Sequence, residues 1–214
     1  MWSRFLYGGR SILVLSALAT LLGVVTGTVI GLVAAYARNW RDDLLMRTMD
    51  VLLAFPAIML ALVVIATVGP KEWLIVLAVA LTTMPRVARV LRGAALTIVE
   101  RDFIGAAEAL GESRARILFS EILPNVTSTL VVEASLRMTY AVALVAAVAF
   151  LGFAPDPNAA DWGLMINENR TALSVQPWGV VLPAIAIALL TIGTGLVGDG
   201  LARASIGIDR GRGE

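Results

Sequence analysis

Residues 11–36 read SILVLSALATLLGVVTGTVIGLVAAY, a stretch of 26 positions without a charged side chain. About 20 apolar residues allow an α-helix to cross the hydrocarbon layer of a bilayer, so this stretch predicts a membrane-spanning helix. Gly23, Gly27 and Gly31 recur at every fourth position and share one face of that helix. Small residues at this spacing let a neighbouring helix approach closely, so we expect them to form a packing face.

The composition of the whole chain is that of a membrane protein. Of its 214 residues, 58% are hydrophobic and 15% are charged, whereas soluble domains carry about 25% charged residues. The chain has no histidine and no cysteine, which excludes Ser-His and Cys-His nucleophilic sites, thiol redox chemistry and zinc sites built on those ligands. Its single lysine, Lys71, follows Pro70 and does not fit a Gly-Lys-Ser/Thr phosphate loop, so any ATP must be hydrolysed by another protein.

Four further apolar stretches follow, and with the first they predict a five-span, all-α membrane bundle that forms one domain over residues 1–214. They lie at about residues 51–70, 73–85, 130–153 and 178–198. We expect Pro56 to kink the second span, because proline removes a backbone hydrogen-bond donor. The third span meets charged residues after 13 uncharged positions, so we expect one long helix that leaves the bilayer. The last span is expected to end at Asp199.

Ionisable residues within or beside these spans are interpreted as structural. One basic stripe contains Arg86, Arg89 and Arg92 at every third position. We interpret it as side chains that extend to the polar interface, in preference to a voltage-sensing or anion-binding role. Glu133 and Arg137 are four positions apart, so they share a helical face and can neutralise each other.

The basic residues divide unevenly between the two sides of the predicted bundle. Twelve fall on one side: Arg38, Arg41, Arg47, Arg86, Arg89, Arg92, Arg101, Arg114, Arg116, Arg203, Arg210 and Arg212. The other side has four, namely Arg4, Arg10, Lys71 and Arg170. An excess of basic residues marks the cytoplasmic side, so we expect the C-terminus in the cytoplasm. Met1 is then expected outside, and because that tail carries two arginines, we expect a further helix upstream of it.

The longest connection on the predicted cytoplasmic side contains residues 101–126, which read RDFIGAAEALGESRARILFSEILPNV. We expect Asp102 to cap a short helix whose apolar face includes Phe103, Ala106, Ala107 and Leu110. Gly111 suits the left-handed residue that ends such a helix, Ser113 can cap the next one, and Pro124 is expected to end it. The prediction is a compact elbow with small residues that suit docking into another protein. The alternative is a helix lying on lipid headgroups, although acidic residues alternate with its arginines.

This connection resembles the loop found in the membrane subunits of bacterial ABC importers. The loop's pattern is Glu-Ala-Ala, three residues, Gly and, about a dozen residues later, Leu-Pro. The matching residues are Ala106, Ala107, Gly111, Leu123 and Pro124. The family's glutamate falls on Gly105, so this chain lacks that carboxylate.

Five other blocks resemble one branch of that superfamily, the permeases for dipeptides, oligopeptides, opines and nickel. They are LLMRTMDVLLAFPAIMLA from Leu44, MPRVARVLRGAALTIVERDFI from Met84, FLGF from Phe150, DWGLMINENR from Asp161 and LVGDGLARA from Leu196. The resemblance covers nearly the whole chain from Ser3. Members of the branch usually begin with one more transmembrane helix, as the charge distribution had already led us to expect.

The resemblance implies a type I ABC importer permease in a bacterial inner membrane, forming half of a translocation pathway. The implied partners are a second homologous permease, two ABC ATPase subunits and an extracytoplasmic substrate-binding protein, with no nucleic acid. The chain itself would be no enzyme and would bind no cofactor or metal, because ATP and Mg would lie on the ATPase subunits. A coupling loop at about residues 99–125 would contact an ATPase subunit through Phe103, Gly105, Ala106, Ala107, Glu108, Leu110, Gly111, Leu123 and Pro124. The polar connection at 154–177 is expected to face the binding protein.

The sequence leaves the identity of the transported substrate open. Peptide is preferred because it is the most frequent cargo of the branch, and nickel or another small solute is the alternative. From a different class, a proton-coupled secondary transporter would need an unpaired acidic residue near the middle of the membrane and often a repeated half. Neither feature is evident in the five predicted spans, and no substrate-contacting residue is predicted.

Overall fold

The structure, a computed structural model, describes residues 2–210, and of residues 205–210 the backbone alone. Its helices are α1 (Trp2–Ala37), α2 (Trp40–Leu53), α3 (Ala57–Val68), α4 (Glu72–Val99), α5 (Asp102–Ala109), α6 (Arg114–Arg116), the π-helical η1 (Ile117–Ile122), α7 (Leu123–Asn125), α8 (Thr127–Phe150), α9 (Trp162–Asn169), the 3₁₀ turn η2 (Arg170–Ala172) and α10 (Trp178–Arg210). The described part contains no strand. Met1, Arg212 and the side chain of Arg210, all named above in the assignment of the two sides, lie outside the described part of the chain.

Four helices, α1, α4, α8 and α10, are long and apolar enough to cross a membrane, and the pair α2 and α3 makes a fifth, broken span. The five-span, all-α prediction is therefore confirmed. The expected kink at Pro56 was too mild, because the axes of α2 and α3 differ by 89°. Pro56 has an extended backbone (ψ 130°) and stands before the first residue of α3, so the chain leaves the helix before it resumes.

Two helices are longer than the apolar pattern predicts. α1 begins at Trp2, nine residues before the uncharged stretch at Ser11, and α10 continues past Asp199 to Arg210. A charged residue can mark the edge of the hydrocarbon layer without interrupting the hydrogen bonds of a helix. The expected start of the first span and end of the last span were therefore wrong as helix boundaries.

The glycine stripe of α1 packs against α4, as predicted. A Cβ atom added to Gly27 would lie 2.6 Å from the carbonyl oxygen of Met84, and one added to Gly31 would lie 2.6 Å from that of Ala88. Both distances are too short for real atoms, so only glycine permits this approach of the two backbones. The seam continues into a cluster of fully buried residues that includes Leu91.

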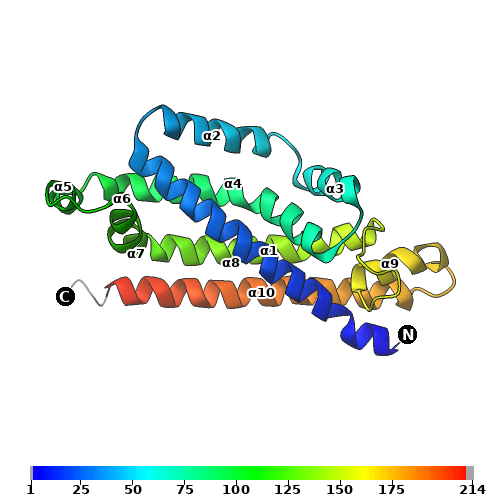
Figure 1. Ribbon diagram of the computed structural model, residues 1–214. Helices are drawn as coiled ribbons and strands as arrows, with labels where there is room; N and C mark the ends of the chain where they lie inside the picture. The colour runs from blue at the N-terminus through cyan, green and yellow to red at the C-terminus, as the bar shows by residue number, and fades with distance from the viewer. Residues whose placement is uncertain (1, 211–214) are drawn as a thin grey trace.

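The short helices are divided between the two ends of the bundle (Figure 1). α5, α6 and α7 lie at the end where α10 finishes, whereas α9 lies at the opposite end, near the start of α1. The five spans thus alternate in direction along the bundle. This is the separation that the charge distribution predicts for the elbow and for the connection at residues 154–177.

Candidate functional site

The elbow between α4 and α8 has one buried side and one exposed apolar side. Ile104 of α5 is 2% exposed and packs with Ile117 and Ile122 of η1. Leu110 is 83% exposed and Phe103 is 43% exposed, although both are large apolar residues. The elbow is therefore fixed to the bundle through one face and presents the other face outward.

The turn at the end of α5 matches the prediction from the sequence. Gly111 has φ +78°, the left-handed conformation that glycine adopts most readily. Its amide donates to the carbonyl oxygen of Glu108 (3.0 Å), and the amide of Glu112 donates to that of Ala107 (3.1 Å). Ser113 then caps α6, because its side chain accepts a hydrogen bond from the amide of Arg116 (3.4 Å).

Two details of the elbow differ from the prediction. Asp102 is the first residue of α5 and not its cap; Arg101 holds the cap position, without a side-chain hydrogen bond. A carboxylate in the first turn still stabilises a helix, through the partial positive charge there. The second helix ends one residue later than predicted, because the chain stays helical from Arg114 through the wider η1 to Asn125, the residue after Pro124.

The predicted coupling residues lie on two separate segments. Seven of them are on α5 or just after it, and Leu123 and Pro124 are on α7. Ala107 and Leu123 are partly buried against the core, and the others are exposed. A Cβ atom added to Gly105 meets no atom within 4 Å, so this position would hold the glutamate of the family pattern without a clash.

The side chains of the α4 arginine stripe were predicted to extend to the polar interface of the membrane, but two of them form ion pairs with α2. Arg92 forms a two-pronged ion pair with Asp42 of α2, with both nitrogen to oxygen distances at 2.6 Å, and Asp42 is 7% exposed. Arg89 pairs with Asp50, also on α2. These two arginines therefore tie α2 to α4 through ion pairs.

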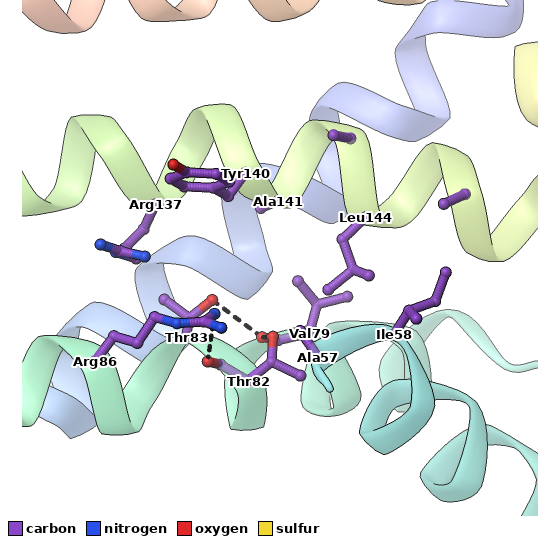
Figure 2. Close-up of a pocket in the computed structure, with 12 residues that line it drawn as sticks. Ala57, Ile58, Val79, Thr82, Thr83, Arg86, Arg137, Tyr140, Ala141 and Leu144 are labelled. Carbon is purple, nitrogen blue, oxygen red and sulfur yellow. Dashed lines mark hydrogen bonds between the residues drawn. The ribbon is translucent and has the colours of Figure 1, made fainter. Parts of the chain in front are cut away.

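Arg86, the third arginine of the stripe, lines a cavity of about 600 Å³ between α3, α4 and α8. Figure 2 shows Arg86 and Arg137 projecting into this space from α4 and α8. Other polar groups there come from Thr82, Thr83 and Tyr140. The remaining lining is aliphatic, from residues such as Ala57, Ile58, Val79 and Leu144.

The predicted pair of Glu133 and Arg137 is confirmed. The Nε atom of Arg137 donates to a carboxylate oxygen of Glu133 at 2.8 Å, and Glu133 is 5% exposed. The Arg137 guanidinium also lies 5.4 Å from the centre of the Tyr140 ring, a cation–π distance. Arg137 is thereby held at the wall of the cavity.

The sequence had not singled out the threonines or Tyr140. Both threonine hydroxyls donate to the carbonyl oxygen of Val79, at 2.8 Å for Thr82 and 3.0 Å for Thr83. A signal was present, since two adjacent hydroxyls stand one turn before Arg86 in an otherwise apolar stretch. It could not show that α8 faces them.

At the opposite end, the connection at residues 154–177 is attached to α1. The indole nitrogen of Trp162 donates to the carbonyl oxygen of Phe5 (2.7 Å), and Arg4 forms an ion pair with Glu168 (3.0 Å). Asp161 caps α9 by accepting a hydrogen bond from the amide of Leu164 (3.1 Å). Burial raises the pKa of Asp161, while hydrogen bonds from this amide, another backbone amide and a serine side chain act in the opposite direction.

These features define a multi-pass helical membrane protein with an exposed elbow at one end of the bundle and a polar cavity between its spans. Residues 27–206 match the family described as the binding-protein-dependent transport system inner membrane component. The chain belongs to this family, and it is accordingly an inner-membrane protein.

Two relatives illustrate the similarity in sequence. A glutathione transport system permease protein of Pectobacterium atrosepticum is 37% identical over 201 residues, which are 94% of this chain and 67% of the relative. A dipeptide transport system permease protein of Alkalihalophilus pseudofirmus is 35% identical over 201 residues, which are 94% of this chain and 66% of the relative. The chain thus spans about two thirds of the length of these relatives.

Solved structures show the same fold at lower identity. A chain of the MetNI methionine ABC transporter, in an inward-facing conformation, matches with a TM-score of 0.76 at 19% identity, over 95% of this chain and 96% of that one. A chain of an amino acid ABC transporter, solved with histidines, matches with a TM-score of 0.68 at 21% identity, over 94% and 92%. The type I ABC importer permease fold is therefore confirmed.

Proposed function

We propose that this chain is the permease subunit of an ATP-driven peptide importer and forms half of the pathway for the peptide. The names of the relatives, for glutathione and dipeptide transport, support this substrate class. The proposed partners are a second homologous permease, two ABC ATPase subunits and an extracytoplasmic binding protein. The chain would bind no ATP or Mg itself and perform no catalysis, and its C-terminus would lie in the cytoplasm.

The observation that carries this proposal is the place of the elbow in the chain. α5 follows α4 after only Glu100 and Arg101, and η1 and α7 lead directly into α8. The helices at the two ends of the elbow are therefore the two helices that provide the polar lining of the cavity. A displacement of the elbow would reach α4 and α8 without passing through any other span.

The elbow is built to transmit such a displacement as a rigid body. Ile104, Ile117 and Ile122 are buried in one cluster, so a movement of α5 that leaves η1 in place would expose apolar surface. Closure of the ATPase dimer would then shift the cytoplasmic ends of α4 and α8 relative to the rest of the bundle and change the shape of the cavity between them. Phe103, Ala106 and Leu110 provide the exposed surface for the ATPase contact.

The first experiment tests the energy source. The assembled importer is reconstituted in vesicles, and uptake of labelled dipeptides is measured with ATP present or absent and with the proton gradient present or collapsed. Uptake that needs ATP and survives collapse of the gradient is expected. Uptake driven by the gradient alone would replace the proposal with a proton-coupled secondary transporter.

The second experiment tests the elbow with two matched variants. Leu110→Asp places a charge on the exposed face of the elbow. Val175→Asp makes the same kind of change at a position that is 89% exposed, three residues before α10, and α10 begins at the end of the bundle opposite the elbow (Figure 1). We expect Leu110→Asp to reduce ATP-driven uptake at least tenfold and to weaken copurification of the ATPase subunits, because a buried unpaired charge costs several kcal/mol at an interface. Val175→Asp should leave ATPase copurification unchanged. Equal copurification in both variants would refute the coupling role of α5.

A further inference from the structure

Arg86 is the member of the α4 stripe for which the described part of the chain provides no acidic partner. Arg92 and Arg89 are neutralised by Asp42 and Asp50. Among the side chains that the structure describes, no carboxylate forms an ion pair with Arg86, whose guanidinium donates only to the carbonyl oxygen of Thr82, at 3.3 Å. Within the described side chains, the positive charge of Arg86 therefore has no directly paired carboxylate.

Counted along their helices from the same end of the bundle, Arg86 and Arg137 stand at similar distances. Arg86 follows the first residue of α4, Glu72, by 14 positions, or about 21 Å at 1.5 Å per residue. Arg137 precedes the last residue of α8, Phe150, by 13 positions, or about 20 Å. Both values are less than the hydrocarbon thickness of about 30 Å, and a guanidinium at this depth faces protein or a water-filled cavity and not lipid.

The cavity carries one net positive charge from its arginines. Arg137 is paired through its Nε atom with Glu133, so its charge is balanced, but its terminal nitrogens remain donors beside the cavity. Arg86 adds a full charge and its own terminal nitrogens. Figure 2 shows the two guanidiniums entering the space from opposite walls, with the hydroxyl of Tyr140 on the same side as Arg137. This arrangement offers hydrogen-bond donors to an anion.

We propose that the cavity binds the carboxylate of the transported solute, with Arg86 as its counter-charge and Arg137 as a second donor. This inference rests on the proposed function, because a peptide with a free C-terminus carries such a group. Planar guanidinium groups bind carboxylates with two parallel hydrogen bonds, more strongly than neutral donors bind them. The volume of about 600 Å³ falls within the range of small-molecule sites.

A second cavity of similar size differs from the first in having no charged side chain in its lining. A groove of about 670 Å³ between α1, α8 and α10 is lined by apolar and small residues such as Leu21, Leu189 and Val197, with no charged side chain in its lining. The charge is thus confined to the side of α8 that faces α4. The aliphatic wall beside the arginines, with Val79 and Leu144, can hold an apolar side chain of a peptide.

The test uses the absence of cysteine from this chain. Ala143, an exposed residue of the cavity wall, is changed by Ala143→Cys in the assembled complex, and its rates of reaction with an anionic and a cationic methanethiosulfonate reagent are compared. Val175→Cys gives the reference ratio for an open position. We expect the anionic reagent to be favoured at Ala143→Cys, and Arg86→Gln to lower that preference about tenfold, because the nearest uncompensated charge is lost.

Arg86→Lys is the matched variant, since it keeps the charge and should keep the preference. If Arg86→Gln fails to fold, the comparison of Ala143→Cys with Val175→Cys, both with Arg86 present, still tests whether the cavity is positively charged. Equal ratios at Ala143→Cys and Val175→Cys would overturn the proposal, as would a ratio that Arg86→Gln leaves unchanged.

Protection from labelling and uptake of dipeptides together test whether the ligand of the cavity is the carboxylate of a peptide. Dialanine with a free carboxylate should slow labelling of Ala143→Cys, whereas dialanine amide should not, and Arg86→Gln should abolish the protection. ATP-driven uptake of a dipeptide mixture should fall about tenfold in Arg86→Gln and largely survive in Arg86→Lys. A wild-type complex that moves no peptide rejects the proposed function itself. A working importer whose Arg86→Gln variant moves dipeptides equally well rejects only the carboxylate site.

Discussion

Helices α1 and α10 have similar apolar sequences but opposite surroundings. Half of the most apolar 18-residue segment of α1 is buried within the chain, whereas only 6% of the corresponding segment of α10 is buried. Gly27 of α1 touches the backbone of α4, but a Cβ atom added to Gly193 of α10 meets nothing within 4 Å. Apolar character therefore predicts that a helix crosses the membrane, and the positions of small residues decide which helices pack together.

Glycines also have different surroundings on the two helices. On α1, three glycines at four-residue spacing lie along one partner, and the two helices can approach until backbone meets backbone. On α10, Gly198 lies against the side chain of Ser135, whereas Gly193 and Gly200 have open space around them. α1 and α4 thus form the rigid seam of the bundle, and α10 is attached mainly along α8 and α9.

The largest expected effect is on the α1 and α4 seam. We expect Gly27→Leu to lower the free energy of unfolding by about 3 kcal/mol, because the new side chain must displace the backbone of Met84 and not merely a flexible side chain. Gly193→Leu adds the same atoms on α10 and should change stability by less than about 0.5 kcal/mol. Equilibrium unfolding of the purified subunit in mixed micelles measures both. Equal losses would contradict the contrast between the two helices.

A smaller effect is expected from removing atoms instead of adding them. Leu91 is 0% exposed beside the seam, and Leu189 of α10 is 64% exposed. Leu91→Ala should lower the unfolding free energy by about 2 kcal/mol, because it leaves a cavity among packed atoms. Leu189→Ala should cost less than about 0.5 kcal/mol, since neighbouring molecules can fill the space. The same unfolding assay applies, and a loss at Leu189 as large as that at Leu91 would show that α10 has a tightly packed partner.

Sequence alone predicted the features that depend on neighbours within about four residues. The glycine face of α1, the left-handed Gly111, the cap at Ser113 and the pair of Glu133 with Arg137 all have this origin. Each follows from the fixed geometry of a helix or a helix end, which needs no knowledge of the remaining chain.

The features that sequence missed depend on distant parts of the chain. The break at Pro56 is 89° wide, and α2 is tied back to α4 by ion pairs between residues 39 and 50 positions apart. A proline rule gives a kink but not its angle, because the angle depends on these contacts. Arg86 was grouped with Arg89 and Arg92 by spacing, yet only the packing of α8 against α4 separates it from them. For the same reason no substrate contact could be predicted.

The smallest expected effect lies where α1 meets α9, at the far end from the elbow. Asp161 is 2% exposed, and because burial raises its pKa, the fold favours the protonated carboxyl group. Its contribution to stability is therefore fully present below the ordinary pKa of an aspartate and is lost as the pH rises through the raised pKa. Asp161→Asn keeps the capping acceptor for the amide of Leu164 and removes the charge.

Asp161→Asn should therefore gain stability relative to the wild type as the pH rises from the ordinary pKa of an aspartate through the raised pKa. The gain should be smaller than the losses expected for Gly27→Leu and Leu91→Ala. Thermal unfolding in detergent across the acidic range measures the difference. Asp156→Asn is the control, since the side chain of Asp156 also accepts a backbone hydrogen bond, from the amide of Asn158 at 2.8 Å, but is exposed. Its unfolding should follow the pH dependence of the wild type. If the unfolding of Asp161→Asn also follows the pH dependence of the wild type, burial does not disfavour the charged form of the Asp161 carboxyl group. The attachment of this connection to α1 would then depend on Trp162 and Arg4.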